Sequence, residues 1–130
     1  MTDRNSPLVT NVLVVAVPVL DQDRARDFYV DVLGFEKHED VVVGDGFRWV
    51  ELRPAGSPVG VALVPVEPDV PAGVDTGIRL AVRDARATHA ALAAAGVEVG
   101  DLLLWDGAPP MFVFSDLDGN RLYIVEVTEP

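Results

Sequence analysis

An internal repeat is the sequence feature that most restricts how this chain can fold. Residues 21–35, DQDRARDFYVDVLGF, have a fainter copy at residues 84–97, DARATHAALAAAGV. Each copy follows a stretch of alternating apolar residues, starts at an Asp that can cap a helix, and closes at a Gly. Asp84 follows Asp21 by 63 positions, and Gly96 follows Gly34 by 62. A strand, a helix cap and a helix stop that recur at one spacing predict two copies of the same strand–helix module.

The first helix of the repeat is strongly specified. Asp21 can accept hydrogen bonds from the unpaired amides of the first turn, and Gly34 can take the left-handed conformation that ends a helix. One apolar face has helical spacing and consists of Ala25, Phe28, Tyr29, Val32 and Leu33. This spacing predicts a helix that packs one face against a sheet, with the next strand beginning at Phe35.

The second helix repeats the pattern with smaller side chains. Its predicted buried face consists of Thr88, Ala91, Leu92 and Ala95. Small residues let a helix approach its sheet closely, but they bury less apolar area. We therefore expect the second helix to lie nearer its sheet than the first and to be held more weakly.

Two motifs resemble the vicinal oxygen chelate superfamily, which includes glyoxalase I, extradiol dioxygenases, and bleomycin and fosfomycin resistance proteins. They are D-x-D-x-A-x-x-FY-x-x-VLGF in the first copy of the repeat and SDLDGNRLYIVE at residues 115–126. The resemblance covers residues 8 to 128 and implies an α+β fold of two tandem βαβββ modules, at about 8–66 and 76–128. In that fold a curved sheet surrounds a concave cavity that a second chain often completes, which implies a homodimer. Because the superfamily carries many unrelated chemistries on one scaffold, activity must be argued from the site.

The length and composition agree with one compact domain over residues 1–130. An apolar content of 49% is ample for a buried core. Residues 54–58 are expected to form a hairpin turn, and residues 67–73 to join the modules. The sequence has no signal peptide pattern and no apolar run of membrane-spanning length, so we expect a cytoplasmic protein. It has no cysteine, which rules out disulfides and thiol chemistry.

The formal net charge of -11 restricts the partners of the chain. Nucleic acids and anionic membrane surfaces are bound by clustered Lys and Arg, and the sequence has no basic patch. We therefore expect neither as a partner. The charge would attract a cationic ligand, although solubility is the simpler explanation for it. The densest acidic run, residues 36–45, is expected to be a solvated strand and loop.

The resemblance also implies where a divalent metal would be held in this fold. The corresponding positions here are Val14, Ala62, Gly77 and Tyr123. Aliphatic side chains and glycine offer no ligand atom, and the residues next to these positions include no His or carboxylate on the three strands where the register could shift. The sequence therefore predicts no metal of the family type and no other cofactor.

Other catalytic groups are few. His38 and His89 are the two histidines, and we expect them to lie far apart in structural roles. There is no phosphate-binding glycine loop, no G-x-S-x-G elbow and no Cys–His pair. What remains is a cavity for an organic molecule.

Period-two alternation selects the residues that would line such a cavity. The neighbours of the vacated metal positions on the same faces are Val12, Ala16, Gly60, Val64, Arg79, Ala81, Arg121 and Val125. Small residues leave space, arginines can clamp a carboxylate or stack on a ring, and tryptophans are good stacking surfaces. The candidate ligand-binding residues are Trp49, Glu51, Arg79, Trp105, Phe112, Arg121 and Tyr123.

Three hypotheses follow from these observations. The first is a metal-free binding protein that holds a small organic molecule, such as an antibiotic or another natural product, in a cavity walled by two chains. The second is a lyase, isomerase or dioxygenase of the same fold, with unconventional metal ligands or with Glu51 and Tyr123 as an acid/base pair. The third is a regulatory or structural dimer whose cavity is vestigial. Metal content, turnover and the presence of an open pocket discriminate among them.

Overall fold

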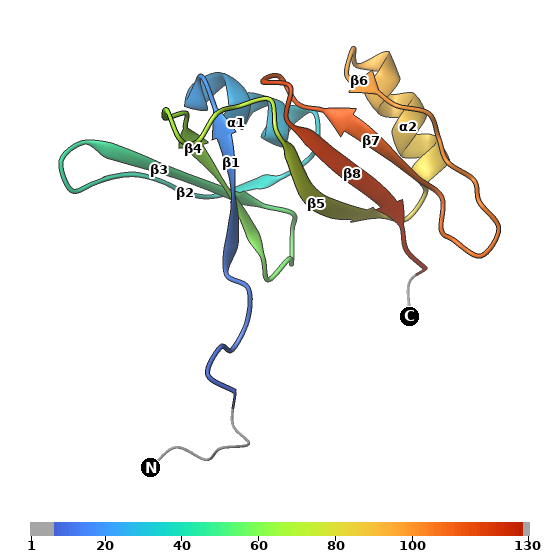
Figure 1. The fold of residues 1–130 in the computed structure, drawn as a ribbon, viewed down its shortest axis with the longest axis horizontal. Helices are drawn as coiled ribbons and strands as arrows, with labels where there is room; N and C mark the ends of the chain where they lie inside the picture. The colour runs from blue at the N-terminus through green and yellow to red at the C-terminus, as the bar shows by residue number, and fades with distance from the viewer. Residues whose placement is uncertain (1–6, 129–130) are drawn as a thin grey trace.

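The computed structural model describes residues 7–128, and within them the order strand, helix, three strands occurs twice. The first module consists of β1 (Val14–Val19), α1 (Gln22–Asp31), β2 (Glu36–Val43), β3 (Phe47–Arg53) and β4 (Gly60–Pro65). The second consists of β5 (Asp75–Val82), α2 (Ala85–Ala94), β6 (Glu98–Val99), β7 (Met111–Ser115) and β8 (Arg121–Glu126). The two modules lie side by side, with both helices on the same side of the molecule, at the top of Figure 1.

Each module forms its own four-stranded sheet. The strand orders are β1-β4-β3-β2 and β5-β8-β7-β6, so equivalent strands occupy equivalent places. The pairs β1–β4 and β5–β8 are parallel, and the other pairs are antiparallel. This topology confirms the α+β fold of tandem βαβββ modules. It also leaves one edge each of β1 and β5 without a partner strand among residues 7–128.

The residues that cap and end the two helices of the repeat have the roles predicted from the sequence. The side chain of Asp21 accepts a hydrogen bond from the amide of Arg24 at 3.1 Å, and that of Asp84 accepts one from Ala87 at 2.9 Å. Both closing glycines have a positive φ, of 82° at Gly34 and 84° at Gly96. That conformation is strained for other residues, so Gly is required where each helix turns into the next strand.

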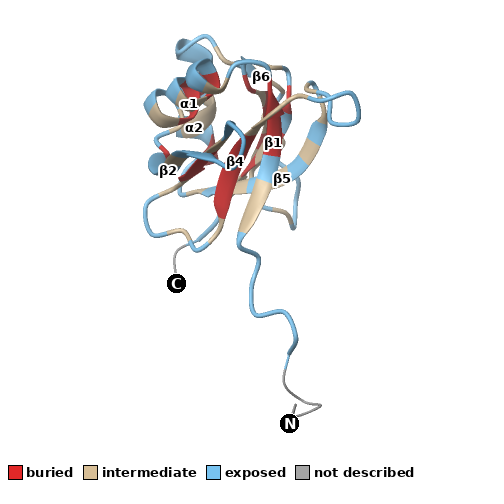
Figure 2. Cartoon of the chain, turned by 90° about the vertical axis from the view of Figure 1, so that its left-hand side faces the viewer, coloured by how far each residue is buried: buried red, intermediate tan, exposed pale blue. Residues whose placement is uncertain are grey.

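The two sheets each turn one face toward the helices, which we call the inner face, and one face away from them, the outer face. The inner face of the first module is fully buried at Val17, Val50 and Leu52, beneath Tyr29 of α1. In the second module Phe112, Phe114, Leu122 and Ile124 are buried in the same way. These residues belong to one apolar cluster that spans both modules, and in Figure 2 the buried strands β1 and β4 lie beside the helices.

Polar contacts also join the modules, through the turn between β7 and β8. The hydroxyl of Tyr29 donates to the Asp116 carboxylate at 2.8 Å, and the Asn120 amide donates to the Pro18 carbonyl at 2.7 Å. Asp118 accepts from the backbone amide of Leu20 at 3.0 Å. Burial, and then the neighbouring Asp116, raise the pKa of Tyr29, which keeps this hydroxyl a proton donor. The sequence predicted only a turn here, whereas the same residues also attach the second module to the first.

The second helix covers its sheet incompletely. Leu92 is buried, but Ala91 and Ala95 of the predicted face are exposed. On β5, the strand that precedes α2 in the chain and lies at the far edge of the sheet from β6, the inner-face residues are only half-buried. Small side chains do not fill the space that larger ones fill under α1, so an apolar surface remains open between the modules. No helix within residues 7–128 is both long enough and apolar enough to cross a bilayer.

Candidate functional site

The outer face of the first module presents Trp49 and Glu51 of β3 above a surface of small residues. Both alternate with the buried Val50 and Leu52, so their side chains point away from α1. The strand register places Glu51 opposite Ala62. The small residues on the same face are Val14, Ala16, Gly60, Ala62 and Val64.

Glu51 is the central polar group of this face. It is 5% exposed, and its carboxylate accepts hydrogen bonds from Arg53 at 2.7 Å and from the Trp49 indole at 3.1 Å. The His38 Nε2 atom lies 4.0 Å away, at a bulge in β2. A Cβ at Gly60 would come within 2.6 Å of Glu51 Oε2, so this carboxylate requires a glycine beside it.

These partners keep Glu51 ionised. Burial raises the pKa of a carboxyl group, but the hydrogen bonds from Arg53 and Trp49 and the nearby His38 outweigh it, and the net pKa of Glu51 is lowered. A paired carboxylate with a low pKa is a weak base at neutral pH. Glu51 is better suited to fixing the Trp49 ring and to accepting a hydrogen bond than to abstracting a proton.

The outer face of the second module carries Arg79, Arg121 and Tyr123. The Arg79 guanidinium lies over the Tyr123 ring at 4.2 Å from its centroid, and its Nη1 donates to the Gly77 carbonyl at 2.8 Å. The Tyr123 hydroxyl donates to Asp75 at 2.6 Å, which raises the pKa of Tyr123. The Arg121 guanidinium is 3.8 Å from Asp75 and half-exposed. The Asp75 carboxylate lies near both arginines, and the register of β6 and β7 places a second acid, Glu98, on the same face.

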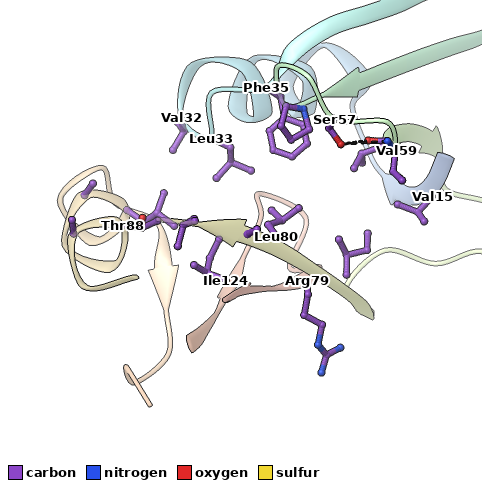
Figure 3. Close-up of a pocket in the computed structure, with 18 residues that line it drawn as sticks. Val15, Val32, Leu33, Phe35, Ser57, Val59, Arg79, Leu80, Thr88 and Ile124 are labelled. Atoms are coloured by element: carbon purple, nitrogen blue, oxygen red, sulfur yellow. Dashed lines mark hydrogen bonds between the residues drawn. The ribbon is translucent and has the colours of Figure 1, made fainter. Parts of the chain in front are cut away.

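In the described part of the chain, Trp49 and Tyr123 do not line the space between the two modules. The inner faces of both modules instead border a single groove of about 670 Å³, which we call the intermodule groove. Its lining includes Val15 and Phe35 on one side and Leu80 and Ile124 on the other (Figure 3). Because the inner faces are turned toward each other, the outer faces are turned apart. In Figure 3 the Arg79 side chain accordingly points away from the apolar residues.

This arrangement decides which candidate residues come together. Trp49 and Glu51 form one group, and Arg79, Arg121 and Tyr123 form another. The acid/base pair of Glu51 and Tyr123 is therefore not assembled within one chain. Alternation along the strands predicted each group from the sequence, but it carries no information on how one module faces the other.

Phe112 and Trp105 lie elsewhere. Phe112 is 1% exposed on the inner face, with its ring against that of His89 at a centroid separation of 4.8 Å. We expected Phe112 in the ligand site, and the structure does not place it there. Met111 and Val113 take the outer-face positions of β7 instead. Trp105 is 63% exposed in the loop between β6 and β7.

Arg53 is the outer-face residue that the sequence reasoning did not select. Its Nη2 holds Glu51, while its Nε is buried without a hydrogen-bond partner among the described residues. The position of Arg53 could have been predicted from the sequence. Arg53 follows Glu51 by two positions, so the two side chains share one face of the strand.

The residues at the metal positions of the fold do not fit a divalent ion. Val14, Ala62 and Gly77 provide no side-chain ligand atom, and the Tyr123 hydroxyl is engaged by Asp75. No group of three or more His, Asp or Glu side chains suited to a metal occurs within residues 7–128. The histidines are in different modules, with His38 near Glu51 and His89 bonded to the Gly100 carbonyl.

The fold and the sequence place this chain in a known class. It belongs to the Glyoxalase/Bleomycin resistance protein/Dioxygenase superfamily, whose sequence pattern matches residues 11–124. Among curated proteins, the uncharacterised YurT of Bacillus subtilis is 30% identical over 125 residues, which cover 88% of this chain and 98% of YurT.

Solved structures extend the comparison. TnmS3, an antibiotic-binding protein from Streptomyces sp. CB03234, is 31% identical with a TM-score of 0.84, over 95% of this chain and all of TnmS3. A member of the same superfamily from Sphaerobacter thermophilus is 33% identical with a TM-score of 0.87, over 93% of this chain and 100% of its own. The fosfomycin resistance protein FosX of Listeria monocytogenes, at 12% identity and a TM-score of 0.72, shares the fold.

Proposed function

We propose that this protein binds a small organic molecule without a metal ion and sequesters it, an antibiotic or another natural product being the expected ligand class. The observation that carries the proposal is the composition of the outer faces. Trp49 and Glu51 on one face, and Tyr123 with two arginines on the other, lie among small residues where the fold would otherwise hold metal ligands. Aromatic surface, a few fixed polar groups and open space suit an organic ligand.

The similarity to TnmS3 supports the same ligand class, because that protein binds an antibiotic. Sequestration needs only affinity: a ligand held by excess protein is removed from its target by mass action, with no chemical step. The low pKa of Glu51 and the missing metal ligands both favour binding over catalysis.

A second copy of the chain completes the proposed cavity. The two outer faces are turned apart in one chain, so a ligand can touch both groups only where the first module of one copy meets the second module of another. In a two-fold dimer such a contact occurs twice, which gives two equal cavities. Each would bring the Trp49 group of one chain opposite the Arg79 group of its partner.

The test is a ligand titration of the purified protein. A panel of natural-product antibiotics that includes bleomycin and fosfomycin is followed by tryptophan fluorescence and by thermal stability. We expect saturable binding of one ligand per chain that persists in EDTA, with the ligand recovered unchanged by mass spectrometry. Chemical conversion of the ligand would instead favour a lyase, isomerase or dioxygenase, and metal-dependent binding would contradict the metal-free proposal.

A matched pair of variants locates the site. Arg79→Gln removes a charge from the outer face and should weaken binding roughly tenfold or more, the loss of one charged contact. Arg86→Gln removes the same charge from the exposed surface of α2 and should leave affinity unchanged. Equal effects of the two variants would show that only the overall charge matters.

A further inference from the structure

The intermodule groove is a concave apolar site that a single chain forms. Its walls are the start of β1 and the turn between β3 and β4 from the first module, and β5 and α2 from the second (Figure 3). Phe35 is buried on the first side, whereas Leu80 of β5 is half-buried and Ala91 of α2 is exposed on the other. The volume of about 670 Å³ lies within the range of small-molecule sites, roughly 300 to 1,000 Å³.

The side chains of the groove offer little to a charged ligand. Among the described residues, Arg79 is the one charged member of the lining, and its side chain points away from the apolar residues. The hydroxyls of Ser57 and Thr88 donate to backbone carbonyls at 3.0 and 2.8 Å. An ion would lose its hydration in the groove without gaining a partner of opposite charge, so the groove favours an uncharged molecule.

The free edge of β5 supplies hydrogen-bonding groups instead. Consecutive residues of a strand direct their backbone N–H and C=O groups to opposite edges. The Val82 carbonyl accepts from the Val127 amide at 2.9 Å, on the β8 side of the strand. The backbone groups of Arg79 and Ala81 therefore point to the other edge, which has no partner strand within residues 7–128. Both residues belong to the groove lining, which places this edge at its wall.

We propose that the intermodule groove binds an uncharged, mainly apolar small molecule that carries an amide group. The amide carbonyl accepts from a backbone N–H of the β5 edge, at Arg79 or Ala81. The amide N–H donates to a backbone carbonyl of the same edge, so the amide pairs with β5 as a neighbouring strand would. The apolar body of the molecule fills the space between the modules, where it is removed from water.

The size of the groove favours a small molecule over a protein surface. A stable protein interface buries about 800 Å² on each partner, and the open surface of the groove is well below that area. The walls are also held in place before a ligand arrives, because buried hydrogen bonds such as that from Tyr29 to Asp116 join the modules. This site is separate from the two-chain cavity of the proposed function, which uses the outer faces.

The first experiment compares two uncharged probes that differ in one hydrogen-bond donor. N-(1-naphthyl)octanamide carries an amide, and 1-(1-naphthyl)nonan-2-one has a CH₂ group in place of its N–H. Calorimetric titration should give one amide probe per chain, with the ketone bound roughly threefold to tenfold more weakly, the loss of one hydrogen bond. Equal affinities would overturn the amide assignment. Failure of both probes to bind would overturn the proposal and leave the groove to a protein partner.

A matched pair of variants tests where the probe lies. Ala91→Trp places a large side chain in the groove from the exposed surface of α2 and should weaken binding at least roughly tenfold. Ala93→Trp makes the same change at an exposed position of α2 outside the groove lining and should leave affinity unchanged. Both positions are exposed, so thermal unfolding should show an intact fold. Equal effects of the two variants would overturn the assignment of the probe to the groove.

The second experiment identifies the contacts of the amide probe by ¹H–¹⁵N NMR. The probe should shift the backbone amides of Arg79 and Ala81 and leave the indole signal of Trp49 in place. Shifts at Trp49 without shifts on β5 would place the probe on the outer face and overturn this inference. The proposed function is tested separately, by the antibiotic titration. Probe binding without antibiotic binding would contradict only the proposed function, and antibiotic binding without probe binding would overturn only the groove ligand.

Discussion

At the scale of single residues, the first module is stabilised by the ion pairs of Asp40 and depends on the close packing of Gly60 against Glu51. Asp40 of β2 accepts hydrogen bonds from Arg48 at 2.8 Å and from Arg26 of α1 at 3.1 Å. The hydrogen bonds from Arg48, opposed by burial and reinforced by Arg26, lower the pKa of Asp40 from 3.8 to about 2. This carboxylate therefore links the helix to the edge of the sheet, a contact that the acidic run at residues 36–45 gave no reason to expect.

The Asp40 network predicts a defined pH dependence of stability. A folded-state pKa below the unfolded value means that the stabilisation is present above pH 4 and is lost as the pH falls toward 2. We expect Asp40→Asn to cost about 1 to 2 kcal/mol at pH 7, less than the full shift implies because the arginines are partly exposed. Urea unfolding at pH 7, 4 and 2 tests this, and the difference from wild type should nearly vanish at pH 2.

Asp27→Asn is the control for that measurement. Asp27 also contacts Arg26 but is 63% exposed, so its removal should change stability by no more than about 0.5 kcal/mol. A pH-independent loss in Asp40→Asn would contradict the ionic origin of the contact.

Gly60 is a second position at which the structure favours one particular residue, because a larger side chain would meet Glu51. Gly60→Ala would place a methyl group 2.6 Å from Glu51 Oε2, and that carboxylate is buried and held by Arg53, so we expect a loss of about 1 to 3 kcal/mol. The same change in a Glu51→Asp background should cost less, because the shorter side chain withdraws the carboxylate. Equal costs in both backgrounds, measured by thermal unfolding, would place the strain elsewhere.

At the scale of elements, the repeat carried most of the predictable information. Capping by Asp21 and Asp84, the stops at Gly34 and Gly96, and the buried face of α1 follow from local rules of hydrogen bonding and periodicity. The turn at residues 116–120 was also predictable as a turn. Its contacts with the first module were not, because they join residues about a hundred positions apart and depend on tertiary packing.

The hydrogen bond from Tyr29 to Asp116 should therefore stabilise the contact between modules. Tyr29→Phe leaves a buried carboxylate with one donor fewer, and we expect a loss of about 1 to 2 kcal/mol in urea unfolding. Tyr123→Phe removes a comparable bond to Asp75 at an exposed site and should cost much less stability, because solvent screens that bond. If both variants lost the same stability, the buried bond would have no special role.

At the scale of the whole molecule, alternation identified the faces, but not how they are arranged. It placed Trp49 with Glu51 and Arg79 with Tyr123. Phe112 was a candidate because of its place in the strand before the DGN turn, not because of alternation, and it lies on the inner face. Which face meets which depends on the packing of one module against the other, and that packing is set by long-range contacts. The groove is open because the small side chains of α2 do not fill it. The periodicity of the sequence does not reveal such a gap.

The most direct test of the account mixes two disabled subunits. Trp49→Ala and Arg79→Ala homodimers should each lose binding of the tightest ligand found in the antibiotic panel. If each cavity joins the first module of one chain to the second module of its partner, a mixed dimer regains one intact site. Reassembling an equal mixture should then restore roughly a quarter of the sites, counted by calorimetric titration. No recovery, in a mixture shown to contain mixed dimers, would contradict the two-chain cavity and place the ligand within a single chain.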